Sequence, residues 1–440
     1  MTEVISDAAQ RGRIRRVFAA LDVGSSRISA MIMGETELGD LIVMGSGQRK
    51  SSGVKRGYIV DREAATNAIR DAIERAERAA QTSIESVWIA CSGAGLSSEV
   101  NKVEIEIGGR RIEEEDVELL LLEAKSMLRP DGRTVLHAQP AHYTLDGAHG
   151  IANPRGLHAE RLGVDIHVVL ADGAPVRNLT EAVQSAHLDV EAVVAAPLAA
   201  GYACLTEEER ELGAALIEIG SDVTNVSVFA AGMLLGLCAI PLGSGDITDR
   251  VASSFGIRRF QAERLKCVAG SAIASPSDYR EMVPVHGPNE TPVAGAAMAR
   301  GADEFNRIVR AELIGVITQV QSQMMDGIGR ALKELGFTGA RSGQIVLTGG
   351  GAELAGLADF AQGALASAVR IGRAPALAGL PEAHSVPAYA GLCGLCLYAA
   401  DDPIDIRAIG VNRRRGPAGA ATGSPFSLLG QFWRAAREAF

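Results

Sequence analysis

The residues with the clearest chemical potential form two copies of one short pattern. Each copy is an apolar strand that ends in a carboxylate, followed by a glycine, a small polar turn and an alternating strand. In the first copy Asp22 precedes Gly24, and in the second Glu218 precedes Gly220. The pattern predicts a β-hairpin with a small turn, whose backbone N–H groups can approach a polyphosphate while the carboxylate reaches Mg²⁺ through water. Two copies predict a duplicated α/β domain that closes on one nucleotide.

Composition and charge set the class of protein. The chain has 440 residues, of which 47% are apolar, enough for the cores of two or more domains. The formal net charge of −10 offers no basic field for nucleic acid. No apolar run reaches about 18 residues, and the first residues do not resemble a secretory signal. The six cysteines show no disulfide-rich spacing, so we expect a cytosolic protein without a transmembrane helix.

Two further segments could contact a nucleoside. A buried strand at 344–348 leads into the glycine turn 349–351, whose backbone can pass close to a base and ribose. Glu263 and Lys266 are three residues apart, so they share one helix face and could hold ribose hydroxyls and adenine edges. Taken alone, the first is an ordinary turn and the second a solvated ion pair.

The remaining elements are read from periodicity. A compact βαβ-type insertion is expected at about 96–172, with a helix at 113–128. Two long helices are expected at about 302–321 and 322–335. Cys393 and Cys396 have the spacing of a redox or metal pair, but no second pair accompanies them, and they are expected to pack inside a small-residue helix.

With these motifs in this order, the chain resembles the FtsA family of bacterial cell-division proteins, within the actin/Hsp70/sugar-kinase ATPase superfamily. The resemblance covers about residues 15–440. The segments that carry it, besides the two hairpins, are Tyr143–Pro154, Arg161–Val169, Ala196–Ala203, Thr206–Gly213, Ile240–Gly245 and the glycine turn after Thr348.

The resemblance implies an α/β fold of the actin-like duplicated ATPase type, with two RNase H-like domains, the inserted subdomain and a C-terminal amphipathic helix. The implied parts are a disordered N-terminus (1–14), subdomain 1A (15–95, 173–210 and 382–400), the inserted subdomain 1C (96–172), subdomain 2A (211–245 and 323–381), subdomain 2B (246–322), a flexible linker (401–424) and a membrane-targeting helix (425–440).

It also implies a cleft for ATP and Mg²⁺ between the two domains. The implied nucleotide-binding residues are Asp22, Gly24, Ser25, Ser26, Arg27, Gly220, Ser221, Glu263, Lys266, Gly349, Gly350 and Gly351, and the implied metal-binding carboxylates are Asp22 and Glu218. Arg27 stands where the family usually has Lys, which keeps the charge and changes its geometry. No catalytic residue is assigned.

The second phosphate loop departs most from the family pattern of Asp, Gly, two further Gly, Thr and a later Asp. The corresponding residues here are Glu218, Gly220, Ser221, Asp222, Val223 and Asn225. Val223 lacks a hydroxyl and Asn225 lacks a charge. Binding survives such changes more readily than the positioning of an attacking water does. We therefore expect ATP binding with slow or negligible hydrolysis.

The C-terminal residues predict an amphipathic helix that begins at Pro425, after Ser424. Its apolar residues fall within an arc of about 140° at 100° per residue, opposite arginines, as in helices that lie in a lipid interface. The expected membrane-binding residues are Phe426, Leu428, Leu429, Phe432, Trp433, Arg434, Arg437 and Phe440. The alternative is a terminal helix docked on its own domain; the linker and the basic triplet 413–415 favour the membrane.

The resemblance implies a membrane-tethered scaffold on the cytoplasmic face of the inner membrane at the division site. Its implied partners are the C-terminal tail of the tubulin-like polymer FtsZ, later division proteins and further copies of itself. The FtsZ tail is expected on about 246–322, where Arg310 is a candidate contact, and the insert is expected to serve the other contacts. Two alternatives are a sugar or acetate kinase of the same superfold and an actin-like pilus-assembly adaptor, which would normally lack the terminal helix.

Overall fold

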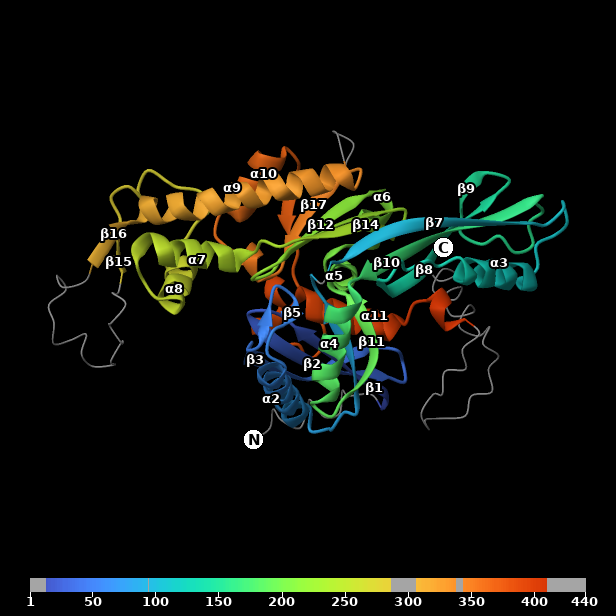
Figure 1. Cartoon of the computed structure of the whole chain (residues 1–440), viewed down its shortest axis with the longest axis horizontal. Coiled ribbons are helices and arrows are strands. Elements are labelled where there is room, and N and C mark those ends of the chain that lie inside the picture. Colours follow the sequence, from blue (N-terminus) through green and yellow to red (C-terminus); the bar gives the residue numbers. More distant parts are fainter. Residues whose placement is uncertain (1–12, 94, 286–305, 338–342, 410–440) are drawn as a thin grey trace. The chain divides into compact units, whose positions relative to one another are not determined.

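The computed structural model describes residues 13–93, 95–285, 306–337 and 343–409, and it divides the chain into two compact units. Unit 1 holds residues up to Glu99, Pro130–Leu136 and Val169–Asp401; unit 2 holds Val100–Arg129, His137–Val168 and the residues from Asp402 onward. Figure 1 shows the elements of both units in chain order.

Unit 1 begins with a five-stranded sheet in the order β11-β6-β1-β2-β3. The first three strands are antiparallel, and β6 and β11 add to β1 in parallel. Strand β2 is buried along most of its length, as expected for a strand covered on both faces. The elements of this half are β1 (Ile14–Val23), β2 (Arg27–Thr36), β3 (Leu41–Lys50), β4 (Val54–Lys55), β5 (Tyr58–Ile59), α2 (Arg62–Ala80), β6 (Ser86–Cys91), α4 (Gly173–Gln184) and β11 (Asp189–Ala195).

The second half of unit 1 repeats this sheet. Its order is β18-β17-β12-β13-β14, with β12, β13 and β14 antiparallel and β17 and β18 added in parallel. The same order and the same strand directions in both halves confirm the predicted duplication. The elements are α6 (Glu207–Leu212), β12 (Ala214–Ile219), β13 (Thr224–Ala230), β14 (Met233–Ile240), α9 (Arg310–Glu334), β17 (Gln344–Thr348), η2 (Gly350–Glu353), α10 (Leu357–Leu365) and β18 (Val369–Ile371).

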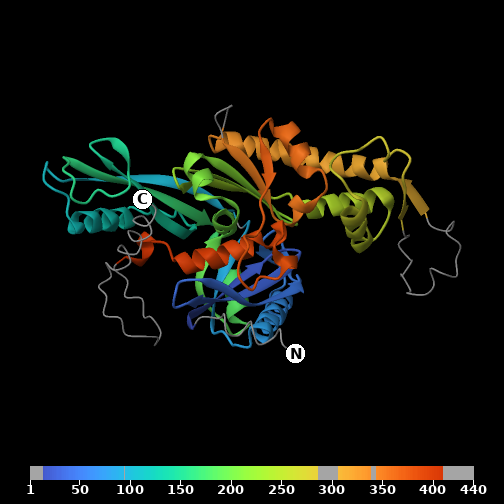
Figure 2. The ribbon, with the colours of Figure 1, turned by 180° about the vertical axis from the view of Figure 1, so that it is seen from behind.

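Two helices of small residues, α5 (Ala196–Cys204) and α11 (Ala390–Asp401), join the halves. They pack so closely that a methyl group on Gly394 would lie 1.8 Å from the carbonyl oxygen of Ala199. Helix α5 also contacts β12 and α11 contacts β1, so the pair lies between the two sheets (Figures 1 and 2). Cys393 and Cys396 are buried in α11, as predicted, and both are free thiols.

A small helical part extends the second half. It contains α7 (Ser244–Phe255), α8 (Arg259–Ala269), the hairpin of β15 (Met282–Val285) and β16 (Asn306–Val309), and the start of α9. Its core includes Ile247, Leu265 and Ile317. Helix α9 runs unbroken from Arg310 to Glu334, so the prediction of two helices meeting at 321–322 is wrong. The polar Gln321 is buried on the inner face of α9, where it interrupts the apolar pattern without ending the helix.

Unit 2 is the insertion. Its sheet has the order β7-β10-β8-β9, with α3 as its helix, which is the predicted βαβ type with one additional strand. Four acidic residues begin α3, and Asp116 accepts a hydrogen bond from the Glu113 backbone (2.9 Å) and a bidentate pair from Arg110. The hydrogen bonds from Arg110 lower the pKa of Asp116. The elements are β7 (Ser97–Glu106), α3 (Glu114–Ser126), β8 (Thr134–Leu145), β9 (Ala148–Ile151) and β10 (Arg161–Ala171).

The segment 402–409, here called the exit segment, is held by the insertion. Ile406 is fully buried, Asp405 accepts a hydrogen bond from the Ala138 backbone (3.2 Å), and Lys125 of α3 donates to the Ile409 carbonyl (2.5 Å). The predicted flexible linker therefore does not include these residues, because one buried side chain and two polar anchors fix them.

Within the described part of the chain, none of the helices is long and apolar enough to cross a membrane. The predicted disordered N-terminus falls largely outside the described residues, which begin at Arg13. The predicted membrane-targeting helix and the rest of the linker lie entirely outside them.

Candidate functional site

The two predicted phosphate loops have the same turn geometry. In the first, the Gly24 N–H donates to the Arg27 carbonyl (3.1 Å); in the second, the Gly220 N–H donates to the Val223 carbonyl (2.9 Å). A methyl group on Gly24 or Gly220 would lie 2.9 or 2.8 Å from the oxygen that closes its own turn. Both turns therefore depend on glycine, and both leave open backbone of the kind that cradles phosphate.

The carboxylates beside the two turns are both buried, and the charge of one is felt at the other. Burial raises the pKa of Asp22 to about 6, and the positive charge of Arg27 partly offsets the increase. Burial also raises the pKa of Glu218 to about 7; the hydrogen bond from Asn225 lowers it, and the negative charge of Asp22 raises it further. A divalent cation held by these two carboxylates would displace their remaining protons into solvent.

Asn225 and Ser92 connect the halves beside these carboxylates. The Asn225 amide nitrogen donates to Glu218 (2.8 Å) and to the Ser92 hydroxyl at the end of β6 (2.9 Å). The Asn225 side-chain oxygen is buried and has no hydrogen-bond partner among the described residues. The Ser51 hydroxyl is also buried without one, although the Ser51 backbone is bonded to Ser26 of the first loop (2.9 Å). Such orphaned acceptors next to both loops fit a site that receives a polar ligand.

The glycine turn after β17 packs directly on the second loop. Gly349 has a φ of +83°, and a methyl group there would lie 2.6 Å from the Ile219 carbonyl oxygen. A methyl group on Gly351 would lie 2.3 Å from the Ile219 side chain, whereas one on Gly350 would meet nothing closer than 3.8 Å. The turn also lies beside the start of α11, where a methyl group on Gly391 would lie 3.0 Å from Glu218.

Glu263 and Lys266 share one face of α8, as predicted, and form an ion pair at 2.8 Å. The Lys266 ammonium is nearly buried and also donates to the Thr248 hydroxyl (2.8 Å) and the Ser244 carbonyl (3.0 Å). Two of its three contacts therefore tie α8 to the first two turns of α7. Glu263 is half-exposed, and hydrogen bonding from Lys266 and Thr248 outweighs its burial, so its pKa is lowered. The assignment of both residues to a nucleoside stays a prediction.

Arg27 points into its own half of unit 1. Its guanidinium lies 4.8 Å from the centre of the Tyr389 ring and donates to Gln48 (3.2 Å). The Tyr389 hydroxyl donates to the same oxygen of Gln48 (2.7 Å), and the His384 ring stacks on the Tyr389 ring (centroids 4.1 Å apart). Arg27 is thus held as a charge near Asp22, and a direct contact between Arg27 and phosphate stays a prediction.

Sequence reasoning missed Arg56, which bridges the two halves from the β4–β5 hairpin. Its backbone N–H donates to Asp222 of the second loop (3.2 Å), and its guanidinium donates to the Pro241 carbonyl (2.8 Å) and to Asp246 (3.2 Å). Arg56 has a φ of +51°, a rare backbone conformation for a residue with a side chain. A positive φ has no signature in a single sequence, so only the fold could identify this bridge.

The residues fit a magnesium–nucleotide complex. The first turn of α7 caps the second loop, where the Ser244 N–H donates to the Gly220 carbonyl (2.9 Å) and the Gly245 N–H to the Ser221 carbonyl (2.6 Å). Asp22 and Glu218 supply oxygen atoms, which Mg²⁺ prefers, and it usually keeps several waters. Among the described residues no cluster of three or more His, Cys, Asp or Glu side chains could hold a metal by itself. The phosphates would complete the ligand set.

Two family profiles match the chain. The profile described as "SHS2 domain inserted in FTSA" matches residues 93–170, and the profile described as "Cell division protein FtsA" matches residues 215–394. The first match covers most of unit 2, and the second covers the second half of unit 1 together with the start of α11.

Relatives named cell division protein FtsA align over most of their length. The protein from Agrobacterium fabrum strain C58 is 35% identical over 402 residues, covering 89% of both chains. The protein from Rhizobium meliloti strain 1021 is 34% identical, covering 90% of this chain and 89% of its own. The protein from Escherichia coli strain K12 is 29% identical over 393 residues, covering 89% of this chain and 92% of its own.

Solved structures agree on the fold. The PilM-PilN type IV pilus biogenesis complex includes a chain that aligns with a TM-score of 0.59 at 17% identity, covering 88% of this chain and 99% of that one. MreB 5 of Spiroplasma citri bound to AMPPNP aligns with a TM-score of 0.50 at 14% identity, covering 87% and 96%. The predicted actin-like fold is thereby confirmed.

Substitution of neighbouring glycines tests the packing of the glycine turn on the second loop. Gly351→Ala places a methyl group against Ile219 and should lower the free energy of unfolding by about 1–3 kcal/mol, the usual effect of overpacking. Gly350→Ala is the matched control and should be nearly neutral. Urea unfolding followed by circular dichroism measures both. Equal stability of the two variants would contradict the described contact.

The raised pKa of Glu218 predicts a pH-dependent stability. Between about pH 4.5 and 7 the unfolded chain releases the Glu218 proton while the folded chain keeps it, so folding loses stability as pH rises through that window. Without Mg²⁺ or nucleotide, Glu218→Gln should be more stable than the parent at pH 8, on the order of 1 kcal/mol, with the difference vanishing near pH 4. Thermal unfolding across pH measures this; Glu208→Gln, at an exposed site on α6, is the control. A constant difference for Glu218→Gln would contradict the assignment.

Proposed function

Because the chain belongs to the FtsA family of cell-division proteins, we propose that it is an actin-like ATP-binding scaffold that anchors FtsZ filaments to the cytoplasmic face of the inner membrane. In this role it also recruits later division proteins and self-associates at the division site. The observation that carries the nucleotide part is the pair of glycine turns that share one closing hydrogen bond, each beside a buried carboxylate.

The proposed ligand is ATP with Mg²⁺, held by both loops. Asp22 and Glu218 would hold the metal through water, and the N–H groups at the turns of Gly24 and Gly220 would contact the phosphates. The turn 349–351 packs on β12 and would lie along the nucleoside. Magnesium would neutralise the two carboxylates whose pKa values burial raises, which gives the metal a defined electrostatic role.

The side chains of the second loop support the proposal that ATP hydrolysis is slow. Val223 is buried and lies near Gly93 of the other half, where it offers no hydroxyl to orient a water. The Asn225 amide nitrogen donates its hydrogen bonds to Glu218 and Ser92. The Asp222 carboxylate accepts from Arg56 and from the Ser221 hydroxyl (3.0 Å). These side chains support the structure of the cleft, and none of them is arranged as a general base for an attacking water.

An apolar surface in the 246–322 region supports a docking site for the FtsZ tail. Arg310 is held by Asp278 (2.8 Å), Glu281 (3.1 Å) and the Ala269 carbonyl (2.9 Å). Next to these three partners in the sequence are three exposed apolar residues, Val268 (79% exposed), Tyr279 (69%) and Met282 (49%). Large apolar side chains at one exposed surface mark a binding site for a partner peptide.

The membrane part rests on the sequence of residues 425–440, which lie outside the described residues. An interfacial helix with aromatic and basic residues binds reversibly and gains strength when several copies act together. The absence of a membrane-spanning helix among the described elements leaves this segment as the proposed attachment.

Co-sedimentation with vesicles tests the anchoring function. The full chain should carry FtsZ filaments down with anionic vesicles, and removal of 425–440 should leave both in the supernatant. The double variant Tyr279→Ser, Met282→Ser should bind vesicles normally and recruit FtsZ about tenfold less. Leu38→Ser, at an apolar residue 88% exposed in the β2–β3 turn, is the control. Normal recruitment by the double variant would exclude the proposed FtsZ surface, and sedimentation of the truncated chain would exclude the membrane segment.

Nucleotide turnover separates this scaffold from a small-molecule kinase of the same fold. We expect the purified chain to bind ATP and to hydrolyse it far below the usual enzymatic range of about 1–1,000 per second. Phosphate release and a screen for phosphoryl transfer to sugars and acetate measure this. Rapid turnover that Asp22→Ala abolishes would contradict the proposal.

A further inference from the structure

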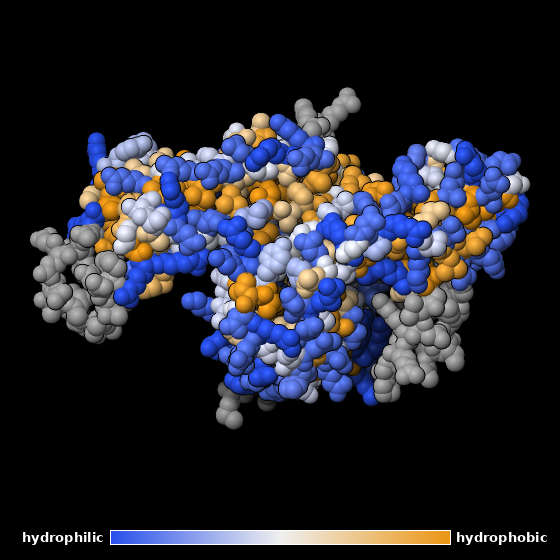
Figure 3. Space-filling model, viewed as in Figure 1, coloured by the Kyte–Doolittle hydropathy of each residue, from blue (hydrophilic) through white to orange (hydrophobic). Residues whose placement is uncertain are grey.

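Helix α3 presents an exposed apolar surface flanked by acidic residues. Leu119 is 56% exposed and Leu122 is 40% exposed, and their spacing of three places them side by side on the helix. Winding α3 at about 100° per residue places Glu115, Glu118 and Glu123 around the two leucines. These five residues are called the α3 face. Figure 3 shows hydrophobic surface at the part of unit 2 where Figure 1 labels α3.

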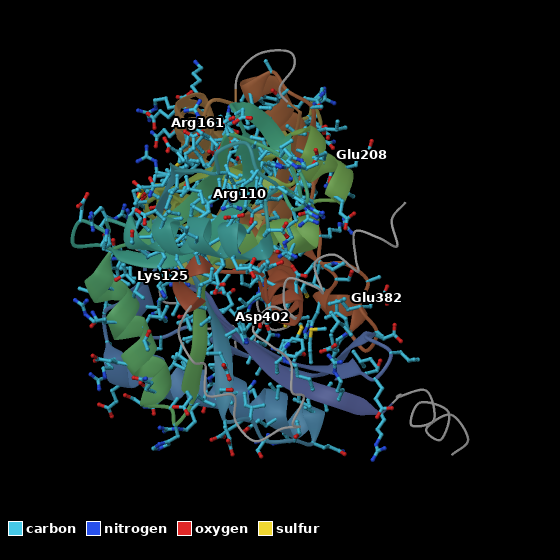
Figure 4. The ribbon with its side chains drawn as sticks, turned by 90° about the vertical axis from the view of Figure 1, so that its right-hand side faces the viewer. Arg110, Lys125, Arg161, Glu208, Glu382 and Asp402 are labelled. Atoms are coloured by element: carbon cyan, nitrogen blue, oxygen red, sulfur yellow. The ribbon has the colours of Figure 1, made fainter. Side chains whose placement is uncertain are left out.

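The exit segment ends beside the α3 face. Lys125, one turn beyond Leu122 on the same helix, donates to the carbonyl of Ile409, and 406–408 also pack on α3. Figure 4 looks at this side of the insertion and labels Lys125 on α3 and Asp402 at the start of the exit segment. The last described residue is therefore held at the C-terminal end of α3, with 31 residues of chain still to follow.

The remaining chain has the length to return along α3. Residues 410–424 are the rest of the predicted linker beyond the exit segment, for which chain statistics give a root-mean-square span of about 21 Å. The 13 residues of α3 span about 20 Å. Because the span matches the helix, the effective concentration of 425–440 at the α3 face is in the range of about 1 mM. A contact that would be weak between separate molecules is then populated within one chain.

The C-terminal segment also complements the α3 face chemically. Its predicted helix carries Leu428, Leu429, Phe432 and Trp433 on one side, which suit Leu119 and Leu122. At about 100° per residue Arg437 lies at the edge of that side, next to Trp433, and Arg434 lies opposite it. The arginine triplet 413–415 begins four residues after Ile409, within about 14 Å of it when extended, and adds positive charge near the same glutamates.

We infer that residues 425–440 dock on the α3 face of their own chain when no membrane is present, so that docking and membrane binding compete for the same apolar side. The inference rests on the proposed membrane function, which this docking would regulate. It gives the α3 face a defined occupant, this chain's own C-terminus. The apparent vesicle affinity is then the intrinsic affinity reduced by the fraction of chains in the undocked state.

Trp433 reports the docked state directly. The chain has two tryptophans, Trp433 and Trp88, of which Trp88 is buried in unit 1. Subtracting the fluorescence of the Trp433→Phe variant from that of the parent chain therefore isolates the emission of Trp433. Without vesicles, we expect Trp433 to emit at short wavelength and to resist acrylamide, independently of protein concentration. The double variant Leu119→Ser, Leu122→Ser should move its emission to that of a solvated indole. Leu38→Ser is the matched control and should leave it unchanged.

Vesicle binding is the second measurement. On vesicles of phosphatidylcholine with phosphatidylglycerol, the double variant should bind about fivefold more tightly than the parent, because docking no longer competes. Solvated Trp433 in the parent chain would overturn the inference. So would shielding that rises with protein concentration, which would assign the face to a second copy, and so would equal vesicle affinity of parent and variant. If neither protein binds vesicles while Trp433 is shielded, the membrane function fails and the docking stands.

Discussion

The close contact of α5 with α11 is the constraint on which unit 1 depends. Gly394 allows α11 to approach the Ala199 carbonyl at a distance that a side chain would forbid, and a methyl group on Gly201 of α5 would lie 2.5 Å from the Phe229 ring. Helix α5 contacts strands of both halves and α11 contacts strands of the first, so the spacing of this helix pair sets the separation of the two sheets. A bulkier helix would move the two phosphate loops apart, and the two carboxylates would no longer share one site.

The two phosphate loops held in this way form what we call an asymmetric clamp, because their side chains differ. The first loop keeps Asp22 with Arg27 held nearby on Tyr389 and Gln48, whereas the second pairs Glu218 with a neutral Asn225. Arg56 and Ser92 of the first half bond to Asp222 and Asn225 of the second, so side chains of the altered loop hold the halves together. The departures from the family pattern thus have structural partners. They would suit the proposed role of holding a nucleotide rather than hydrolysing it.

The sequence predicted those elements that depend on repeated motifs or on alternating apolar residues. The two hairpins, the glycine turn and the small-residue helices were predictable because turns, strand alternation and close helix packing each require particular residue types. The unbroken α9 was not, because buried Gln321 reads as a break in an apolar face. Docking of 402–409 was not, because the burial of Ile406 and the bond from Ala138 to Asp405 depend on partners distant in the sequence. The role of Arg56 was not predicted, because it depends on a positive φ and on partners distant in the sequence.

The most direct test of the clamp is calorimetric titration of the full chain with a non-hydrolysable ATP analogue and Mg²⁺. The account predicts one nucleotide per chain, with Gly24→Val and Gly220→Val each weakening binding by a similar large factor, because both turns hold the same phosphates. Binding that survives substitution of either turn, or that reaches two nucleotides per chain, would contradict the claim that the duplicated hairpins form a single site.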